Sequence, residues 1–414
     1  MRVLYFTGAY RPDSMVSHTH GDLVAALRAR GADVEIATVA GGEQSRRGVS
    51  SRDRHGTTVW SIAVAQSLRD RLMRRYDARV WAFAPFGGLV HALRAFLTPD
   101  RLSRYDLLHV GMAFPYATAF RHAMHGRERP PTLVTLTGGD ILTDDETGYG
   151  YGRSPVTRAA IRRTLGWATL VQANSPLSAD AAAAYSCARE RIAVQPPHSP
   201  HEPLALRDVR AYRARCRQEL IASGAIPPGR LLVGIGRMVP IKGYDDVIRA
   251  LPIIRATHPD TAIMLAGPAR DAAAEAYVAS LRRLAASLGL ENQVHIVGAA
   301  PFEDVPRYFA AADLALIPSL LDGLNMTGVE AASVGTPSVV SERAGVAHYV
   351  RACGAGAVVP PRDPAALAAA IVKLLGDARV WEDASRHALQ MAAPFSLAQT
   401  ADGVARLYDR LHAG

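Results

Sequence analysis

The sequence predicts an α/β protein of two domains, each a parallel sheet with helices on both faces. At 414 residues the chain is long for one hydrophobic core. In both halves, short apolar and β-branched runs alternate with helical stretches, which is typical of a parallel sheet covered on both sides. Between the halves lies QPPHSPHEP, residues 195–203, whose four prolines cannot join the interior of a helix or a sheet.

The first half begins with a β-α-β unit. Residues 3–7 are expected to form a strand that ends at Gly8. A polar loop, 8–17, leads into an amphipathic helix that ends near residue 30, and a Gly-Ala-Asp turn precedes a second strand at 34–39.

The second half repeats the alternation more strongly. Apolar runs predict strands at 231–236, 261–267, 294–298, 313–319, 337–341 and 356–360. Helical patterns are expected at 244–259, 272–288, 305–312 and 328–334. We therefore predict a first domain at 1–198 and a second at 199–394, with a final helix, 395–414, that packs back on the first domain.

Composition limits the classes of partner. The formal charge of +9 is compatible with nucleic acid, an anionic membrane surface or anionic small substrates. Lys242 and Lys373 are the only lysines among 47 basic residues, so a lysine at a chosen site is unexpected. Residues 67–97 are both basic and apolar; they fit weak peripheral contact with a membrane, or a helix pair whose arginines are solvated.

The sequence contains little that indicates a signal peptide, a membrane span or a metal site. It has no apolar run long enough to span a membrane, and residues 1–6 resemble a buried strand more than a signal peptide, so we expect a cytoplasmic protein. Cys187, Cys216 and Cys353 lack disulfide or zinc spacing. His198 and His201 are too few for a metal site. We therefore expect no metal and no cofactor.

The stretch GRMVPIKG, residues 236–243, carries the first candidate site. A strand ends at residue 235, Gly236 lets the backbone turn, and Arg237 and Lys242 follow before a helix. In an open α/β sheet, ligands bind beyond the carboxyl ends of the strands, where the amino termini of helices also point. Two cations there suit a diphosphate; the other interpretation is a loop with two surface charges.

A second candidate site lies in the loop after the strand at 313–319. Asp322 is expected to be exposed there, and Asn325 or Thr327 can cap the helix that follows. Main-chain N–H groups of residues 324–327 can bind a phosphate, and Glu330 can accept hydrogen bonds from a ribose diol. The alternative is that Asp322 serves the turn and Glu330 only the start of the helix.

Taken in order, GRMVPIKG, IPS, DGLNMTGVEA and GTP resemble the motifs of retaining glycosyltransferases of family 4, which have the GT-B fold of two facing Rossmann-like domains. The close match covers residues 231–340. The resemblance implies catalytic roles for Arg237 and Lys242, on the diphosphate, and for Asp322, facing the donor sugar. It implies that Glu330 holds the ribose, and that the donor is also contacted by Gly8, Gly236, Gly298, Gly323, Leu324, Asn325, Met326 and Thr327.

The sequence departs from that family at three positions. Asp322 stands where the family usually has Glu, and Asn325 stands where it has a glycine, although asparagine tolerates a left-handed backbone. Thr137 replaces a histidine that approaches the donor sugar. The candidates for the sugar and acceptor side are accordingly His18, His109, Gly138, Gly139 and Asp140. For His18 and His109 a structural role is the alternative.

The resemblance implies transfer of a sugar from a nucleoside diphosphate sugar, most commonly a UDP-sugar, to a hydroxyl-bearing acceptor, with retained configuration and without metal. We expect no nucleic-acid partner. Two other classes stay open: a nucleotide-sugar epimerase of the same fold, and a non-catalytic protein that binds nucleotide sugars.

Overall fold

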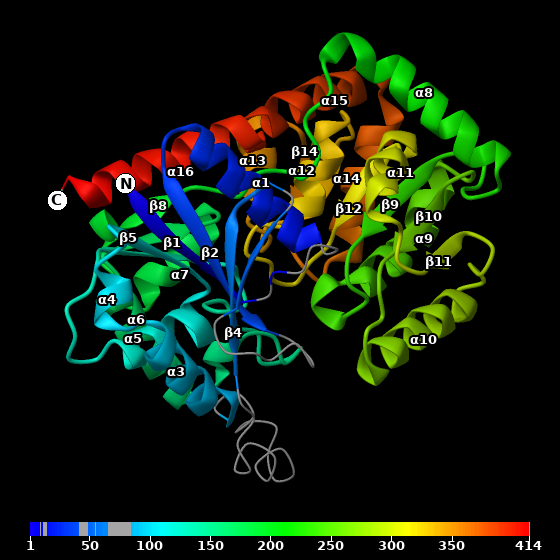
Figure 1. The fold of residues 1–414 in the computed structure, drawn as a ribbon. Helices are drawn as coiled ribbons and strands as arrows, with labels where there is room; N and C mark the ends of the chain where they lie inside the picture. The colour runs from blue at the N-terminus through cyan, green and yellow to red at the C-terminus, as the bar shows by residue number, and fades with distance from the viewer. Residues whose placement is uncertain (9, 11–14, 41–48, 54, 65–83, 414) are drawn as a thin grey trace. The chain divides into compact units, whose positions relative to one another are not determined.

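A computed structural model describes residues 1–8, 10, 15–40, 49–53, 55–64 and 84–413 of the chain. Its main-chain contacts divide it into two units (Figure 1). Unit 1 comprises Met1–His198 with Leu397–Gly414, and unit 2 comprises Ser199–Ser396. The division therefore lies inside the proline-rich stretch at 195–203.

In the described part of unit 1, eight strands form one sheet in the order β3-β4-β2-β1-β5-β6-β7-β8. All neighbours are parallel except β3 and β4, which are antiparallel. This edge pair departs from the predicted parallel sheet because only residues 53–57 join its strands, too few for a parallel crossover. The strands are β1 (Arg2–Thr7), β2 (Asp33–Ala40), β3 (Val49–Arg52), β4 (Thr58–Ala63), β5 (Leu107–Gly111), β6 (Thr132–Thr135), β7 (Leu170–Ala173) and β8 (Ile192–Val194).

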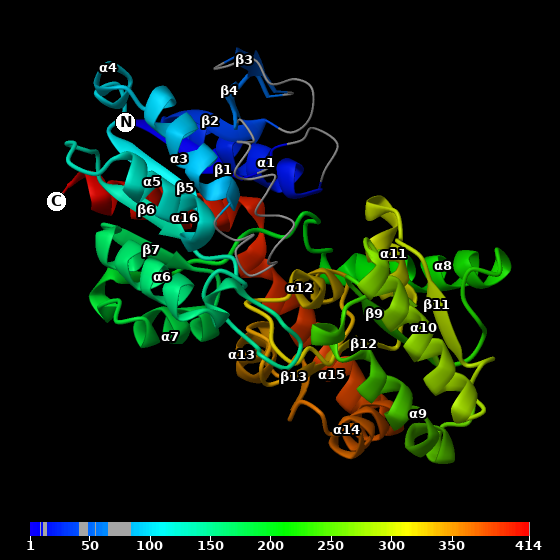
Figure 2. The same ribbon diagram turned by 90° about the horizontal axis from the view of Figure 1, so that it is seen from below.

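Helices cover both faces of this sheet (Figures 1 and 2). Successive side chains of a strand point to opposite faces, so Tyr5 joins the core beneath α1 and α16, whereas Phe6 packs on Phe120 of α5 on the other face. Tyr408 of α16 is fully buried in the first of these cores. The helices are α1 (Met15–Ala29), α3 (Ala84–Phe96), α4 (Pro99–Leu102), α5 (Thr118–Ala123), α6 (Pro155–Trp167), α7 (Pro176–Ala184) and α16 (Leu397–His412).

Unit 2 is built on a sheet of six parallel strands in the order β11-β10-β9-β12-β13-β14. From β9 the chain first winds outward to β11 and then returns to start again at β12. This strand order is that of a doubly wound nucleotide-binding sheet, whose ligand crevice lies where the order reverses, between β9 and β12. The strands are β9 (Leu231–Ile235), β10 (Ala262–Ala266), β11 (Val294–Val297), β12 (Leu314–Ile317), β13 (Ser338–Ser341) and β14 (Gly356–Val359).

The helices of unit 2 also lie on both faces of its sheet. Leu232 packs toward α9, α10 and α14, while Leu231 and Val233 pack toward α8 and α11. The predicted strands and the helices at 244–259, 272–288 and 305–312 agree with the structure to within two residues at each end. The helices are α8 (Leu206–Ala222), α9 (Tyr244–Thr257), α10 (Ala272–Ser287), α11 (Val305–Ala311), α12 (Met326–Ser333), α13 (Val346–Cys353), α14 (Pro364–Gly376) and α15 (Ala378–Ala392).

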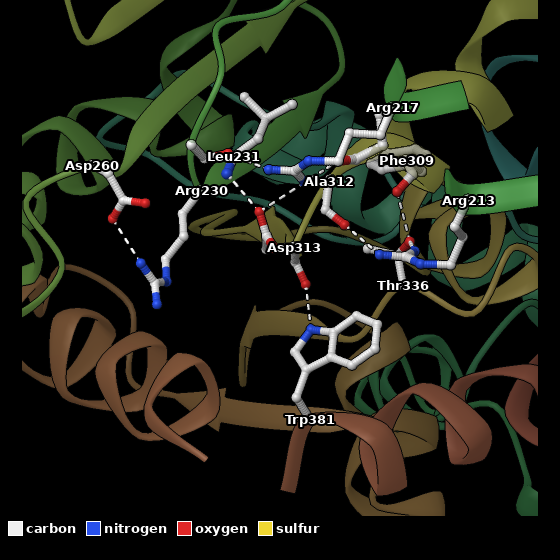
Figure 3. A network of polar contacts seen from close by, with 12 residues as sticks. Arg213, Arg217, Arg230, Leu231, Asp260, Phe309, Ala312, Asp313, Thr336 and Trp381 are labelled. Carbon is white, nitrogen blue, oxygen red and sulfur yellow. Dashed lines mark hydrogen bonds and ion pairs between the residues drawn. The ribbon is translucent and has the colours of Figure 1, made fainter. Parts of the chain in front are cut away.

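Two arginines of α8 tie that helix to the amino-terminal edge of the sheet in unit 2 (Figure 3). Arg213 donates to Thr336 Oγ1 and, at 2.6 Å, to the carbonyl of Ala312, and its guanidinium lies 5.0 Å from the ring centre of Trp381. Arg217 donates to the carbonyl of Ala311 at 2.7 Å and pairs with Asp313. Carbonyls at the end of α11 are thus capped by α8.

We expect Arg213→Ala to lower the free energy of unfolding by roughly 2 kcal/mol, because the carbonyl of Ala312 and the hydroxyl of Thr336 would lose their donors. Urea unfolding followed by circular dichroism measures this. Arg210→Ala is the matched control: Arg210 lies on the same helix, has a side chain that is 93% exposed, and pairs with Glu382 at the surface. Equal losses in both variants would show that the network contributes nothing beyond surface charge.

In the part of the chain that the structure describes, no helix combines the length and the apolar character needed to cross a membrane. The segment 67–97, for which membrane contact was considered, lies partly outside this part of the chain. Residues 84–96 form α3, and residues 67–83 are not described.

Candidate functional site

The loops after β9 and β12 are packed together at the point where the strand order reverses. The main-chain N–H of Leu320 donates to the carbonyl of Ile241 at 2.8 Å. Gly243 has φ 66°, and a Cβ there would stand 2.3 Å from the carbonyl oxygen of Pro318. Only glycine meets both conditions without strain, so the Lys-Gly pair of the motif fixes how closely the two loops approach.

Lys242 and Asp322, predicted from separate motifs, form an ion pair. Lys242 Nζ lies 2.6 Å from Asp322 Oδ2, and the two side chains are 15% and 19% exposed. The carboxylate also accepts from Asn325 Nδ2 at 3.0 Å. Burial raises the pKa of Asp322, but the Lys242 ammonium and the hydrogen bonds from Lys242, Asn325 and the Leu324 main chain outweigh it, so the pKa lies below its ordinary value.

The expectation that Asp322 is exposed was therefore wrong. Its main-chain N–H donates to the carbonyl of Arg343 at 3.1 Å, and its carbonyl accepts from Gly345 at 3.0 Å. These bonds attach the loop after β12 to the loop after β13, which turns the side chain inward toward Lys242. A sequence cannot show this attachment, because the two loops meet only in the folded sheet.

Helix α12 begins at Met326, two residues earlier than predicted, with Asn325 as its N-cap. Asn325 has φ 74°, the left-handed backbone that the sequence comparison required of it, and its Oδ1 accepts from the Gly328 N–H at 3.3 Å. Among the described residues, no hydrogen bond is recorded for the main-chain N–H groups of Asn325, Met326 and Thr327. These donors at a helix start are suited to an anion.

Arg237 follows β9 and is exposed; its carbonyl accepts from the Val239 N–H at 2.9 Å, and no ion pair or hydrogen bond to its side chain is recorded among the described residues. Lys242 is balanced by Asp322, whereas no partner of the Arg237 guanidinium is recorded among the described residues. The two basic residues of the motif thus differ in kind: one is held in place and the other is free to meet an anion.

Glu330 lies on α12 and is buried, with a side chain only 5% exposed. The basic side chain recorded beside it among the described residues is that of His201, whose Nε2 lies 3.8 Å from Glu330 Oε1, and no hydrogen bond to the carboxylate is recorded there. Burial raises the pKa of Glu330 to about 8. A buried carboxyl group without hydrogen-bond donors is costly to keep, which is typical of a group that meets its partner in a ligand.

Sequence reasoning considered His201 only as a metal ligand and missed its neighbours. Its ring stacks on Phe302 with centroids 4.6 Å apart, and its Nε2 is buried without a hydrogen-bond partner among the described residues. Burial lowers the pKa of His201, and Glu303 partly offsets this. Residue 201 lies in the proline-rich stretch, which has no periodic pattern, so no sequence signal connects it with Glu330.

The other predicted donor contacts are distributed along the same strand ends. Gly236 follows β9, and a Cβ there would lie 2.9 Å from the Tyr244 hydroxyl oxygen. The exposed Gly298 follows β11, where its carbonyl accepts from Gly267 at 3.1 Å. Gly323 and Leu324 are buried in the loop before α12, and Met326 and Thr327 are half-buried in its first turn.

Gly8, at the end of β1, lies against Tyr116. A Cβ on Gly8 would overlap the Tyr116 ring, at 2.0 Å from its carbon atoms, so this position accepts no side chain unless the ring moves. The sheet of unit 1 also reverses its order beside β1, between β1 and β5, so Gly8 lies at the corresponding strand edge. The main chain of His18 is part of α1, and its side chain lies outside what the structure describes.

Asp140 organises its own loop. It is fully buried, and its carboxylate accepts from the N–H groups of Ala113, Thr137 and Gly138 at 2.8–3.0 Å. Gly138 has φ 114°, and Gly139 lies against the Tyr149 ring. The Asp140 carboxylate also lies 3.3 Å from Thr137 Oγ1, so it holds this loop together and fastens it to Ala113. Its place on the sugar and acceptor side stays a prediction. Thr137, in the same loop, is exposed.

His109 is structural, which corrects its predicted place on the acceptor side. Its Nδ1 lies 2.8 Å from the Tyr408 hydroxyl and its Nε2 lies 2.6 Å from Thr135 Oγ1, so both ring nitrogens are occupied. Burial, with a contribution from the charge of His20, lowers the pKa of His109 to about 3. His20 contacts the Tyr5 hydroxyl at 2.5 Å, and burial lowers its pKa to about 4.

These two histidines predict acid sensitivity. Their pKa values in the folded state lie below the ordinary 6.5, so the unfolded chain binds more protons, and each histidine removes stability as the pH falls below 6.5. We expect a loss of about 1.4 kcal/mol per pH unit for each, down to about pH 4. Unfolding free energies at pH 7, 6 and 5 measure it. His20→Gln should reduce the slope and His348→Gln, at an exposed position, should not; an unchanged slope in His20→Gln would contradict the assignment.

Within the described residues, no group of three or more His, Cys, Asp or Glu side chains is placed to hold a metal ion. The site in unit 2 instead combines an exposed arginine, a buried lysine-aspartate pair, three main-chain donors and a buried glutamate. These features lie at the strand-order reversal of a doubly wound sheet, the place where α/β proteins of this class commonly bind nucleotides.

Comparison with known proteins identifies both units. Residues 217–393 match the family model of glycosyl transferases group 1, and residues 16–198 match that of the glycosyl transferase 4-like domain. The chain therefore belongs to the group 1, family 4-type glycosyltransferases, with the GT-B fold. This confirms the family and the fold class predicted from the motifs.

Curated relatives agree with this family. A D-inositol 3-phosphate glycosyltransferase of Nocardia farcinica is 30% identical over 228 residues, 54% of this chain and 48% of that protein. A GDP-mannose-dependent alpha-(1-6)-phosphatidylinositol monomannoside mannosyltransferase of Mycolicibacterium smegmatis is 33% identical over 156 residues, 36% of this chain and 39% of that protein. The chain thus spans half or less of the length of these relatives.

Among solved structures, Alr3699/HepE of Anabaena, crystallised with UDP, is similar over 99% of this chain and 100% of that one. The TM-score is 0.73 at 20% sequence identity, a likeness of fold.

Proposed function

We propose that the protein is a cytoplasmic retaining glycosyltransferase, which moves a sugar from a nucleoside diphosphate sugar to a hydroxyl group without a metal ion. The observation that carries the proposal is the buried Glu330 carboxyl group, without a recorded hydrogen bond among the described residues, one helix turn beyond the unoccupied N–H groups of α12. A nucleoside diphosphate would satisfy both features, because its ribose diol can donate to the Glu330 carboxylate and its diphosphate can accept from the N–H groups at the start of α12.

The proposed chemistry places developing charge on the diphosphate. As the bond between the anomeric carbon and the phosphate oxygen breaks, Arg237 and the α12 N–H groups stabilise the departing anion, and Lys242 adds its remaining donors. The acceptor oxygen forms its bond on the same face of the sugar, and its proton passes to the departing phosphate oxygen. In this scheme Asp322 acts by holding Lys242 and orienting its ammonium group.

The donor we propose is a UDP-sugar. The support is a fold shared with a protein crystallised with UDP, whereas the name of one relative specifies GDP-mannose. The acceptor we propose is a hydroxyl-bearing small molecule or glycan, since the relatives are named for inositol phosphate and phosphatidylinositol mannoside acceptors.

Calorimetric titration with UDP, GDP and ADP tests the donor site. We expect micromolar binding of one nucleotide, and at least tenfold weaker binding by Arg237→Ala, because a charge-assisted contact is lost. Arg249→Ala, exposed on neighbouring α9, is the control for net charge and should bind like the original protein. No binding of any nucleotide would overturn the proposal.

Product analysis separates the proposed activity from its alternatives. A transferase should hydrolyse the donor slowly without acceptor and form an α- or β-linked product that keeps the donor's configuration. An epimerase would instead return an isomerised sugar without any acceptor. Tight nucleotide binding with no turnover under either condition would indicate a binding protein.

A further inference from the structure

Unit 1 contains a cationic cavity that the proposed reaction does not use. Its volume is about 420 Å³, and its walls include Arg121, His125, Arg127, Arg129, Arg163 and Trp167. None of the described residues that line it is acidic. Pockets for small ligands commonly measure about 300–1,000 Å³, so the volume suits one.

This cavity lies at the opposite end of the strands from the carboxyl edge of the sheet, which carries Gly8 and Asp140. The chain leaves α5, passes residues 124–130 and enters β6, while the last turns of α6 lead into β7. These are the amino-terminal ends of β6 and β7, and α5 and α6 are in contact with each other. The cavity is thus separate from the carboxyl edge of the same sheet.

Two of the arginines, Arg127 and Arg129, are held by contacts with neighbouring residues and form walls of the cavity. Arg129 donates to the carbonyl of Trp167 at 2.7 Å and stacks on its ring at 4.5 Å. Arg127 donates to the carbonyl of Leu97 at 2.8 Å. These contacts resemble the arginine network of unit 2, where carbonyls and Asp313 satisfy the guanidinium groups (Figure 3).

The other two arginines differ from that pattern. Arg121 Nε is buried without a hydrogen-bond partner among the described residues, and its Nη2 faces His122 Nε2, at 2.8 Å, instead of an acid. No hydrogen bond or ion pair is recorded for the exposed side chain of Arg163 in the described part of the chain. Burial and then the charge of Arg163 lower the pKa of Arg121, as expected where cations repel one another. Glu128, on the same loop, lines a neighbouring cavity instead.

We propose that this cavity binds a phosphate group, through Arg121 and Arg163, as a second anion site apart from the donor site. A guanidinium group presents paired donors that match phosphate oxygens, and a phosphate dianion would both satisfy Arg121 Nε and relieve the repulsion. The phosphate can be that of a soluble compound or that of an anionic lipid headgroup. The proposal does not depend on the glycosyltransferase activity.

Calorimetry with inorganic pyrophosphate tests the site in the full chain. We expect the Arg121→Ala/Arg163→Ala variant to lose one binding event, or to bind at least tenfold more weakly. Arg162→Ala is the matched control, because Arg162 is exposed beside Arg163 on α6 and does not line the cavity. The donor site is intact in all three proteins, so its contribution cancels. Unchanged binding in the double variant, or an equal loss in the control, would overturn the proposal.

Flotation with vesicles distinguishes the two sources of phosphate. If the ligand is a headgroup, vesicles of phosphatidylglycerol and phosphatidylcholine should bind the control but not the double variant, and pure phosphatidylcholine should bind neither. Independently, Arg163→Ala should raise the melting temperature by roughly 1–2 °C at low ionic strength, and less at high salt, because it removes repulsion. A lower melting temperature of Arg163→Ala would contradict the inference that Arg163 and Arg121 repel each other without a compensating acid.

Discussion

Lys242→Ala is expected to lower the free energy of unfolding by about 3 kcal/mol and to abolish sugar transfer. The ammonium group lies 2.6 Å from Asp322 Oδ2, and both side chains are more than four-fifths buried. Removing one partner of a buried ion pair leaves the other charge without compensation, which costs far more than the pair itself contributes. Urea unfolding measures the first effect, and donor turnover measures the second.

A double variant separates stability from catalysis. Lys242→Met/Asp322→Asn removes both charges, so we expect it to recover much of the lost stability while remaining inactive. Lys373→Ala is the natural control, because it removes the only other lysine, at an exposed position on α14. If the double variant transfers sugar at the original rate, Lys242 has no part in the reaction.

Glu330→Gln is expected to stabilise the protein above pH 8 and to weaken nucleotide binding ten- to a hundredfold. Burial raises the pKa of Glu330 in the folded state to about 8, against 4.5 for the free side chain. Between these values the folded protein holds a proton that the unfolded chain has released, so the contribution of Glu330 to stability falls as the pH rises, by about 1.4 kcal/mol per unit. Below pH 6.5 this pH dependence is opposite in sign to that of His20 and His109. Glutamine does not titrate in this range. The free energy of unfolding of Glu330→Gln, relative to that of the original protein, should therefore increase from pH 5 to pH 8 and then stay constant.

Nucleotide binding should show the opposite trend with pH. A ribose diol donates to the ionised carboxylate, so binding requires Glu330 to lose its proton, and affinity should rise between pH 6 and pH 8. Calorimetry in two buffers of different ionisation enthalpy measures the proton released. The phosphate groups of the nucleotide titrate equally with both proteins, so Glu330→Gln isolates the residue's contribution. Equal proton release by both would contradict a contact between Glu330 and the nucleotide.

The order of apolar runs in the sequence was sufficient to predict the sheet of unit 2. Strands such as β9 and β10 are short, buried on both faces and bounded by glycine or proline, so local pattern and final structure agree. The motif glycines were informative for a similar reason: Gly243 needs both a left-handed backbone and close contact with Pro318. Asn325 likewise occupies the left-handed conformation that its position required.

Other features depended on contacts between segments far apart in the chain. His109 and Asp140 have residue types common in active sites, yet their polar atoms are occupied. Tyr408 and Thr135 contact the His109 ring, and the N–H groups of Ala113, Thr137 and Gly138 donate to Asp140. Local sequence does not show whether a histidine at a strand end will face a ligand or another helix. The antiparallel β3–β4 pair was not predicted; β3 is short and largely polar, whereas β4 is a mostly apolar run of six residues.

The sequence by itself determined the two α/β units, the family and the strand ends at which the candidate site lies. Only the tertiary structure decided the state of each charged group there: Lys242 paired with Asp322, Arg237 exposed, and Glu330 buried beside His201. Periodicity and turn residues act over a few neighbouring positions, so they can be recognised directly in the sequence. Charge pairing and burial depend on which loops meet at the edge of the folded sheet, and eighty residues separate Lys242 from Asp322.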